Sequence, residues 1–395
     1  MAGKVSFALR LAVVPVLVVV IAFLERRQPF GMFRLITFGA VFFLFANIAS
    51  LLRGNWRDFL LVLASLAFGI FLIEAAANIW EPREPTNRVV QDGFYAPRPV
   101  TGWGPAHTGR FHDEKTDQET GATIYSADYT IDSNLLRHTQ SCEKGSAIVF
   151  FGCSFAFGLG LNDADTLPQA FADSIDHKVR ILNLGYPAYG PHQFLSELQA
   201  GIFDSVIGPQ PKLFVFETAA WHADRSACKP WWVQHAPRYI IENGQLILKG
   251  VCHEGLDLWF QEWLRSSAAY RWLIEPYRNK VSHEDIELYL QITLAAINLA
   301  KAKYDVPVVV LYIGRGGENS FLQGTGFGTE AVLQRLRDGG AIVIDASLSE
   351  EKAAGMAISI PGDGHPTALG NRLRASILKN YLERNMSGVL TASVN

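Results

Sequence analysis

Three long apolar runs near the start of the chain constrain its fold more than any other feature. They span residues 7–24, 35–52 and 59–73. Each is long enough, or nearly so, to cross a hydrocarbon layer of about 30 Å as a helix. A cleaved signal peptide is the alternative for the first run, but arginines rather than a small-residue cleavage site come after it. The pattern therefore predicts a membrane anchor of about three helices over residues 1–80.

The basic residues beside these runs say little about orientation. One side of the membrane would carry Lys4, Arg10, Arg53 and Arg57, and the other Arg26, Arg27, Arg34 and Arg83. Because the two sets balance, the rule that basic loops stay in the cytoplasm hardly discriminates. Three spans nevertheless place the two termini on opposite sides of the membrane.

The remaining composition excludes some functions. The hydrophobic fraction of 49% is concentrated in residues 7–79, and a net charge of -3 with no basic stripe argues against a nucleic-acid partner. The four cysteines lack the spacing of a structural zinc site, so we expect neither a metal nor another cofactor. Cys228 and Cys252 either form a disulfide, if the domain lies outside the cytoplasm, or remain free thiols.

A proline-rich linker, "EPREPTN" (81–87), separates the apolar runs from the rest of the chain. Residues 81–144 are predicted to form this linker and a β-rich lead-in. From residue 145 to 395, short apolar runs such as "AIVFFG" and "KLFVFET" alternate with helical patterns. This alternation predicts an α/β fold with a doubly wound parallel sheet, and residues 221–283 are expected to form an insertion over one edge.

Ser154 stands in "FFGCSFAFG" (150–158), directly after a predicted strand. Such a turn exposes a serine together with backbone N–H groups, as a nucleophile requires. Glycine and serine also occur in many purely structural turns, and that alternative is open for this pattern alone. A phosphate-binding loop is disfavoured because the G-K-[ST] ending is missing.

A second polar cluster, "GDGHPTALGN" (362–371), precedes the last predicted helix. A serine hydroxyl needs an imidazole to accept its proton, and a neighbouring carboxylate orients that imidazole. His365 and Asp363 are the candidates for these roles. The parallel sheet predicts that they lie at the same edge as Ser154.

These motifs together resemble those of the SGNH hydrolases, also called the GDSL esterases and lipases. The segment "FFGCSFAFGLGLNDADTLPQAFAD" resembles the first sequence block of that family, with Cys153 in place of the usual aspartate. The segment "ILNLGYPAYGPHQ" resembles the second block, and "DGHPTALGN" resembles the last. The resemblance covers residues 128–382. It implies Ser154 as nucleophile, His365 as base, Asp363 as its partner, and the N–H groups of Ser154 and Gly185 in the oxyanion hole.

Two departures from the family pattern bear on the site. The family usually places its aspartate three residues before the histidine, where this chain has Gly362; the D-x-H spacing used here is similar to that of alginate acetyltransferases. The asparagine that normally comes after the third strand is also missing from "KLFVFETAAWHADR". His222 or Arg225 could supply the missing donor, and the alternative is that both line a polar loop.

The sequence thus predicts a membrane-anchored serine esterase that removes or transfers O-acyl groups, with an acylated envelope or exported carbohydrate as the expected partner. We expect it in a bacterial inner membrane with its catalytic domain outside the cytoplasm. The alternative is a carbohydrate-binding or assembly protein that retains the fold without the chemistry. The missing asparagine favours this alternative, whereas the intact Ser154, Asp363 and His365 disfavour it.

Overall fold

The computed structural model describes residues 2–26, 32–82, 85–314 and 316–391. Arg27 and Arg83, which entered the orientation argument, and residues 83 and 84 of the predicted linker lie outside these ranges. The chain divides into two compact units. The first, the three-helix unit, comprises Met1–Arg83 and Glu254–Asn279; the second, the sheet unit, comprises Glu84–His253 and Lys280–Asn395.

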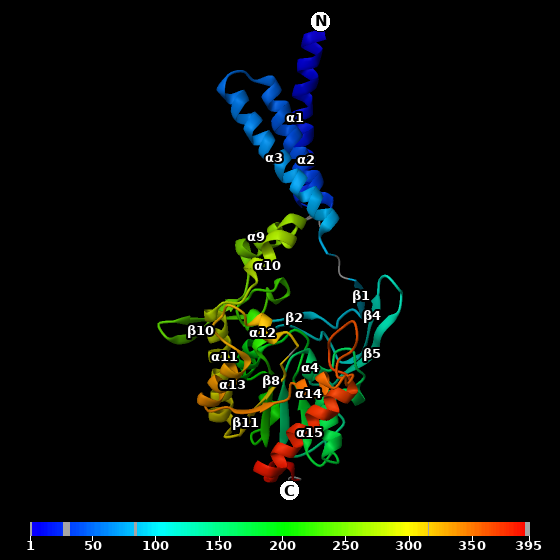
Figure 1. Ribbon diagram of the computed structural model, residues 1–395, viewed down its shortest axis with the longest axis vertical. Helices are drawn as coiled ribbons and strands as arrows, with labels where there is room; N and C mark the ends of the chain where they lie inside the picture. Colours follow the sequence, from blue (N-terminus) through cyan, green and yellow to red (C-terminus); the bar gives the residue numbers. More distant parts are fainter. Residues whose placement is uncertain (1, 27–31, 83–84, 315, 392–395) are drawn as a thin grey trace. The chain divides into compact units, whose positions relative to one another are not determined.

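The three apolar runs form the helices α1 (Ala2–Arg26), α2 (Met32–Leu51) and α3 (Asn55–Trp80), shown in blue in Figure 1. Their apolar stretches Phe7–Glu25, Arg34–Leu51 and Asn55–Trp80 are long and apolar enough to cross a membrane. Most of their large side chains face outwards, as Val19 and Leu66 do, whereas small residues such as Ala64 and Ala67 are buried. A bundle that is apolar on its outer surface suits a lipid environment.

The three-helix unit also contains a segment that is distant in sequence. It consists of α9 (Gly255–Arg265) and a second helix that begins near residue 268, passes through a π-helical stretch (η4, Tyr270–Ile274) and ends as α10 (Glu275–Arg278). The sequence assigned these residues to an insertion (221–283) over the sheet. In the structure, Glu254–Asn279 cluster with the membrane-type helices instead.

The sheet unit begins with antiparallel strands. The strands β1 (Thr86–Val90), β4 (Gly109–Asp117) and β5 (Thr123–Ile131) form one sheet in that order, and β2 (Ala96–Arg98) pairs with β3 (Gly102–Gly104). In β5, Tyr125, Ala127, Tyr129 and Ile131 are buried, and the residues between them are more exposed. This period of two is that of a strand with one face on the core.

The main sheet has five parallel strands in the order β12-β11-β8-β6-β7. They are β6 (Ala147–Phe151), β7 (Arg180–Asn183), β8 (Leu213–Thr218), β11 (Val308–Tyr312) and β12 (Ile342–Asp345). Every residue of β6, β8 and β11 is buried, which explains their continuous apolar sequences. Numbered along the chain, the strand order is 2-1-3-4-5, and the predicted doubly wound sheet is confirmed.

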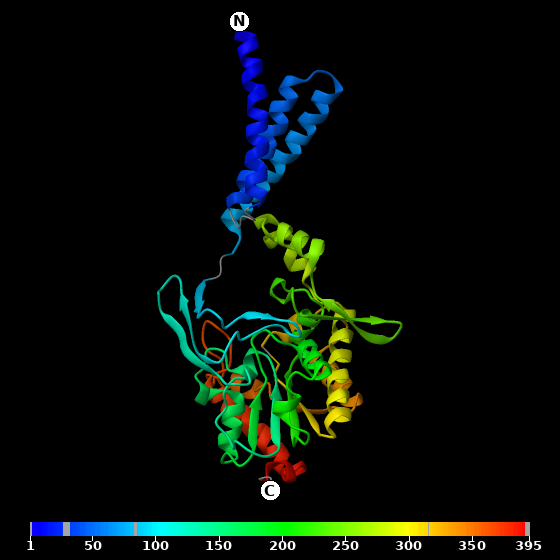
Figure 2. The same cartoon turned by 180° about the vertical axis from the view of Figure 1, so that it is seen from behind.

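The longer helices pack in two groups, which can be followed in Figures 1 and 2. α5 (Leu167–Ser174) packs against α15 (Ala368–Asn385), and α11 (His283–Tyr304) packs against both α6 (Pro191–Ala200) and α13 (Thr329–Asp338). The shorter elements are α4 (Ser154–Phe157), η1 (Asp163–Asp165), α7 (Asp204–Ile207), η2 (Ala220–His222), α8 (Ala223–Ser226), η3 (Trp231–Val233), β9 (Pro237–Glu242), β10 (Gln245–Val251), α12 (Glu318–Phe321), α14 (Ser349–Ala353) and η5 (Ser387–Leu390).

The β9–β10 hairpin is the part of the predicted insertion that does belong to the sheet unit. A disulfide joins Cys228, just after α8, to Cys252, just after β10. The structure therefore contains the pair that the sequence left undecided. Cys252 packs with Val233 and Ala236 in a small cluster of its own, so the bond anchors the base of the hairpin.

Candidate active site

Ser154 begins α4 immediately after the carboxyl end of β6. The turn is tight because a Cβ at Gly152 would lie 2.3 Å from the Cβ of Ala156, so no other residue fits at Gly152. Cys153 caps the helix, since its Sγ accepts the Phe155 N–H at 3.4 Å. The first N–H groups of a helix have no partner within it, which leaves the Ser154 N–H to face an incoming group.

Ser154, His365 and Asp363 form a continuous chain of hydrogen bonds. The Ser154 Oγ lies 2.9 Å from His365 Nε2, and His365 Nδ1 lies 2.5 Å from Asp363 Oδ1. The Asp363 carboxylate fixes the tautomer, because an Nδ1–H that donates to it leaves Nε2 to accept the serine proton. The structure thus brings together, across 211 residues of sequence, the three side chains proposed from the two motifs.

The histidine lies on a short turn between β12 and α15. The Ile360 N–H donates to the His365 carbonyl at 2.7 Å, and the Gly364 N–H donates to the Ile360 carbonyl at 2.9 Å. The His365 ring also packs on Phe155 of the nucleophile turn, with ring centres 5.5 Å apart. The backbone bonds fix the turn, and Phe155 packs against the imidazole ring. The D-x-H spacing is therefore sufficient to orient the base, although the family's usual aspartate position is Gly362.

Lys115 of β4 adds a fourth member that the sequence did not indicate. Its Nζ donates to Asp363 Oδ2 at 2.8 Å, and both side chains are largely shielded from solvent. Burial by itself raises the pKa of the Asp363 carboxyl. The hydrogen bonds and charges of His365 and Lys115 outweigh burial and hold this pKa well below its usual range. The carboxylate is therefore ionised throughout the neutral range. No spacing signal could have revealed Lys115, which lies 248 residues from its partner.

The N–H of Gly185, one of the proposed oxyanion donors, already has a hydrogen-bond partner. The Gly185 N–H donates to Asn183 Oδ1 at 3.0 Å, while Asn183 Nδ2 donates to the Ala156 carbonyl at 2.9 Å. Asn183 thus ties the loop after β7 to the nucleophile turn. An oxyanion bound at Gly185 would share this N–H with Asn183 Oδ1. The role of Gly185 in the oxyanion hole stays a prediction.

Arg225 and His222 both lie at the end of β8, as expected. Arg225 donates from Nη1 to the Tyr189 carbonyl at 2.6 Å and lies between the Trp221 and Trp232 rings. His222 is fully buried, and its Nδ1 lies 2.9 Å from Thr218 Oγ1. In these positions Arg225 supports the loop after β7, and His222 lies on the buried side of the nucleophile turn, near Cys153. Whether either touches substrate stays a prediction.

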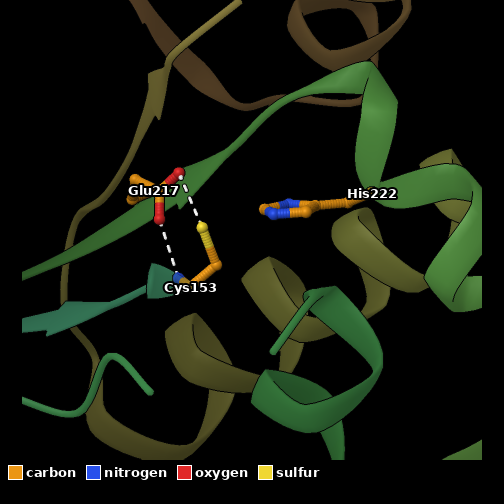
Figure 3. Close-up of side chains that lie close together, drawn as sticks. All are labelled: Cys153, Glu217 and His222. Carbon is orange, nitrogen blue, oxygen red and sulfur yellow. Dashed lines mark hydrogen bonds between the residues drawn. The ribbon is translucent and has the colours of Figure 1, made fainter. Parts of the chain in front are cut away.

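A buried polar cluster, Cys153, Glu217 and His222, includes the residue directly before Ser154 (Figure 3). Cys153, Glu217 and His222 each bring one potential ligand atom within 4.8 Å of the others. Glu217 Oε2 accepts the Cys153 N–H at 2.7 Å, and Oε1 lies 3.7 Å from the Cys153 Sγ. These residue types are able to bind a metal, but the Glu217 carboxylate already holds the Cys153 backbone. We therefore interpret the cluster as a support for the turn that carries Ser154.

Burial dominates the electrostatics of this cluster. It raises the pKa of Glu217, and the hydrogen bonds from Cys153 and the charges of Arg225 and Arg374 oppose the rise only in part. None of the sequence motifs pointed to Glu217. A single glutamate at the end of an apolar strand gives no hint that β8 lies beside β6, although that pairing places it under Cys153.

Comparison with known proteins returns neighbours at the level of the fold. No family model matches the chain, and no curated protein matches its sequence. Among solved structures, a lipolytic protein of the G-D-S-L family from Veillonella parvula is 14% identical, with 61% of this chain and 100% of that one covered and a TM-score of 0.36. A psychrotrophic esterase, EstA, from Pseudoalteromonas is 8% identical, covering 62% and 100% at a TM-score of 0.36. A carbohydrate acetylesterase family member from Sinorhizobium meliloti is 11% identical, covering 61% and 98% at a TM-score of 0.34.

The descriptions of the matched structures include the G-D-S-L family and an SGNH hydrolase. Any chemistry of this chain depends instead on the positions of its own Ser154, His365 and Asp363.

Proposed function

We propose that this protein is a serine hydrolase that cleaves or transfers O-acyl groups through an acyl-Ser154 intermediate. The observation that carries the proposal is the hydrogen-bonded series from Ser154 Oγ through His365 to Asp363, at 2.9 and 2.5 Å. A serine hydroxyl within hydrogen-bond reach of an imidazole that a carboxylate orients is the arrangement that activates a nucleophile.

The reaction can be derived from the same atoms. Ser154 Oγ attacks the ester carbonyl carbon while His365 Nε2 takes the hydroxyl proton, and the Ser154 N–H stabilises the oxyanion. The tetrahedral intermediate collapses when the ester C–O bond breaks and His365 returns the proton to the leaving alcohol. Water or a second hydroxyl then loses its proton to His365 and attacks the acyl carbon; the bond between this carbon and Ser154 Oγ breaks, and His365 returns the proton to Oγ, which regenerates Ser154. The Asp363 carboxylate stabilises the imidazolium in both halves.

The proposed setting is the outer side of a bacterial inner membrane, with α1–α3 as the anchor. Two observations support it: the three helices long and apolar enough to span, and the disulfide, which belongs in an oxidising compartment. An O-acylated envelope or exported carbohydrate is the proposed substrate. This choice rests on the D-x-H spacing that resembles alginate acetyltransferases. Hydrolysis and transfer differ only in the acceptor.

The test is the activity of the full-length protein in detergent on p-nitrophenyl esters, with and without a sugar acceptor. Ser154→Ala and His365→Ala should each lower kcat by on the order of 10⁵-fold, and the double variant should be hardly worse, because the residues act as one unit. Asp363→Asn should cost less. The exposed Ser126 on β5 provides the matched control, since Ser126→Ala should remain fully active.

Covalent labelling separates catalysis from binding alone. A fluorophosphonate probe should label the wild type and Ser126→Ala but not Ser154→Ala. A fully active Ser154→Ala protein would refute the mechanism. Failure of the probe to label the wild type, together with inactivity on every ester, would favour the carbohydrate-binding alternative.

A further inference from the structure

The segment formed by residues 255–278 presents an apolar stripe to its surroundings. In α9, Leu256, Trp259, Phe260 and Trp263 recur at helical spacing, and Asp257, Gln261 and Arg265 occupy the opposite side. Leu256 is 85% exposed, Trp259 52% and Phe260 47%. The next helix continues this exposure with Leu273, Ile274 and Tyr277. Within the sheet unit, exposed large apolar side chains such as Val89, Ile202 and Trp231 lie in different segments of the chain and do not share one helix.

One end of the stripe is attached to the membrane-type helices. Trp263 Nε1 donates to Glu25 Oε2 of α1 at 3.2 Å, and Arg34 of α2 lies over the Trp263 ring. Arg34 also donates to Ser266 Oγ at 2.7 Å and to the Trp263 carbonyl at 3.2 Å. Because α1 ends at Arg26 and α2 begins at Met32, these contacts lie at one end of the bundle.

A second attachment lies deeper along α3. The buried Glu74 accepts the N–H groups of Ala268 and Ala269 at 2.8 and 3.1 Å and the Ser267 hydroxyl at 2.6 Å. Glu74 thereby caps the helix that leads to α10. It stands six residues before the end of α3 at Trp80, about 9 Å along the helix axis. Because Glu74 comes directly after the apolar run 59–73, the start of that helix is held where this run ends.

A salt bridge fixes the same helix further along. The guanidinium of Arg271 binds the Glu81 carboxylate through two hydrogen bonds of 2.7 Å, immediately past the end of α3. Contacts with all three membrane-type helices thus hold residues 255–278 at the level where the spans end.

We propose that residues 255–278 lie in the headgroup region of the bilayer, with Leu256, Trp259 and Phe260 inserted among the lipid chains. The proposal rests on the membrane anchoring proposed above, but not on the esterase chemistry. Amphipathic helices that lie in a membrane surface bury their apolar face about 5–10 Å into the boundary between headgroups and lipid chains. The attachment at Glu74, directly after the apolar run 59–73, is at such a boundary. The two tryptophans of the stripe, with Arg265 on the polar side of α9, also suit the boundary between lipid and water.

The continuity of the stripe selects lipid as the occupant. Trp263 rests on the ends of α1 and α2, and the rest of the stripe extends from this contact. A helix bound at the end of a membrane span has the bilayer as its neighbour. A second copy of the chain, or the sheet unit folding over the stripe, are the other possible occupants and are distinguished by the test.

The experiment places single spin labels on the full-length protein in phosphatidylcholine–phosphatidylglycerol vesicles. Cys142→Ser removes the exposed free thiol; the other cysteines are buried (Cys153) or disulfide-bonded. Labels are attached to Leu256→Cys and Phe260→Cys on the stripe and to Asp257→Cys and Glu262→Cys as matched controls. Leu66→Cys, exposed in the middle of α3, reports the membrane interior. All five positions are exposed at the surface of the structure, so the labels should not disturb folding.

Collisions of each label with oxygen and with a water-soluble nickel chelate measure its depth. The stripe labels should favour oxygen over nickel several-fold more than the matched controls do, and less than the label at residue 66. Nickel access at residues 256 and 260 equal to that at 262 would overturn the proposal. So would low access of both reagents, which indicates a covering protein surface. If either result occurs while the label at residue 66 still favours oxygen over nickel, the membrane anchor stands and only the placement of residues 255–278 fails. Esterase activity of the same samples reports separately on the proposed function.

Discussion

Lys115 shows how much one residue outside the sequence motifs contributes to the site. Its ammonium group pairs with the Asp363 oxygen that does not contact His365. It therefore offsets part of the charge that the carboxylate directs at the imidazole. We interpret Lys115 as a positioning residue that tunes the base without contacting the substrate.

Removing this charge should change the pH dependence of the reaction. In Lys115→Met, the Asp363 carboxylate acts on His365 alone and favours the imidazolium, which cannot accept the serine proton. The acid limb of the kcat/KM profile should therefore move to higher pH, by up to about one unit. Lys115→Arg, which keeps the charge, should retain the wild-type profile. A uniform loss of activity in Lys115→Met with an unmoved limb would show that Lys115 is only structural.

The same residues mark the limit of prediction from sequence. Ser154, Asp363 and His365 could be proposed because each lies in a short motif at the end of a predicted strand or before a helix. Lys115 and Glu217 could not, because their roles arise from contacts between strands that are far apart in sequence. The spacing of residues within a motif carries no information about which strand lies beside it.

Among the secondary-structure elements, the continuously apolar strands were the easiest to predict from the sequence. The strands β6, β8 and β11 are buried on both faces, so their sequences reveal them directly. The segment 255–278 was misplaced within the predicted insertion because an amphipathic helix shows which face is apolar, but not what covers that face. Its partners, Glu25, Arg34 and Glu74, lie in helices that the sequence had assigned to the membrane alone.

The disulfide is the element that can be tested most directly. It closes a loop with a sequence separation of 24 and should stabilise the fold by about 3 kcal/mol through the reduced entropy of the unfolded chain. Cys228→Ser with Cys252→Ser should lower the thermal midpoint of the sheet unit by several degrees, and reductant should do the same to the wild type. The exposed Cys142 is the control, because Cys142→Ser should leave the midpoint unchanged. A midpoint insensitive to both treatments would mean that the bond does not form in the purified protein.

For the whole molecule, the disulfide and the three spans make a joint prediction about topology. An odd number of spans separates the termini, and a disulfide-bonded domain belongs outside the cytoplasm, so the N-terminus should lie inside. The ends of α1 and α2 that bind residues 255–278 would then be at the outer leaflet. The basic residues balance on the two sides, and the disulfide favours this orientation.

Reporter fusions in bacterial cells test this orientation. Alkaline phosphatase, which needs an oxidising compartment to fold, should be active when fused at the C-terminus and inactive when fused after Gly54, in the turn between α2 and α3. A cytoplasmic fluorescent protein should show the opposite pattern at both sites. The two sites lie on either side of α3, so each serves as the control for the other. Phosphatase activity after Gly54 but not at the C-terminus would reverse the orientation and exclude an envelope substrate. Activity at both sites would mean that α3 does not cross the membrane.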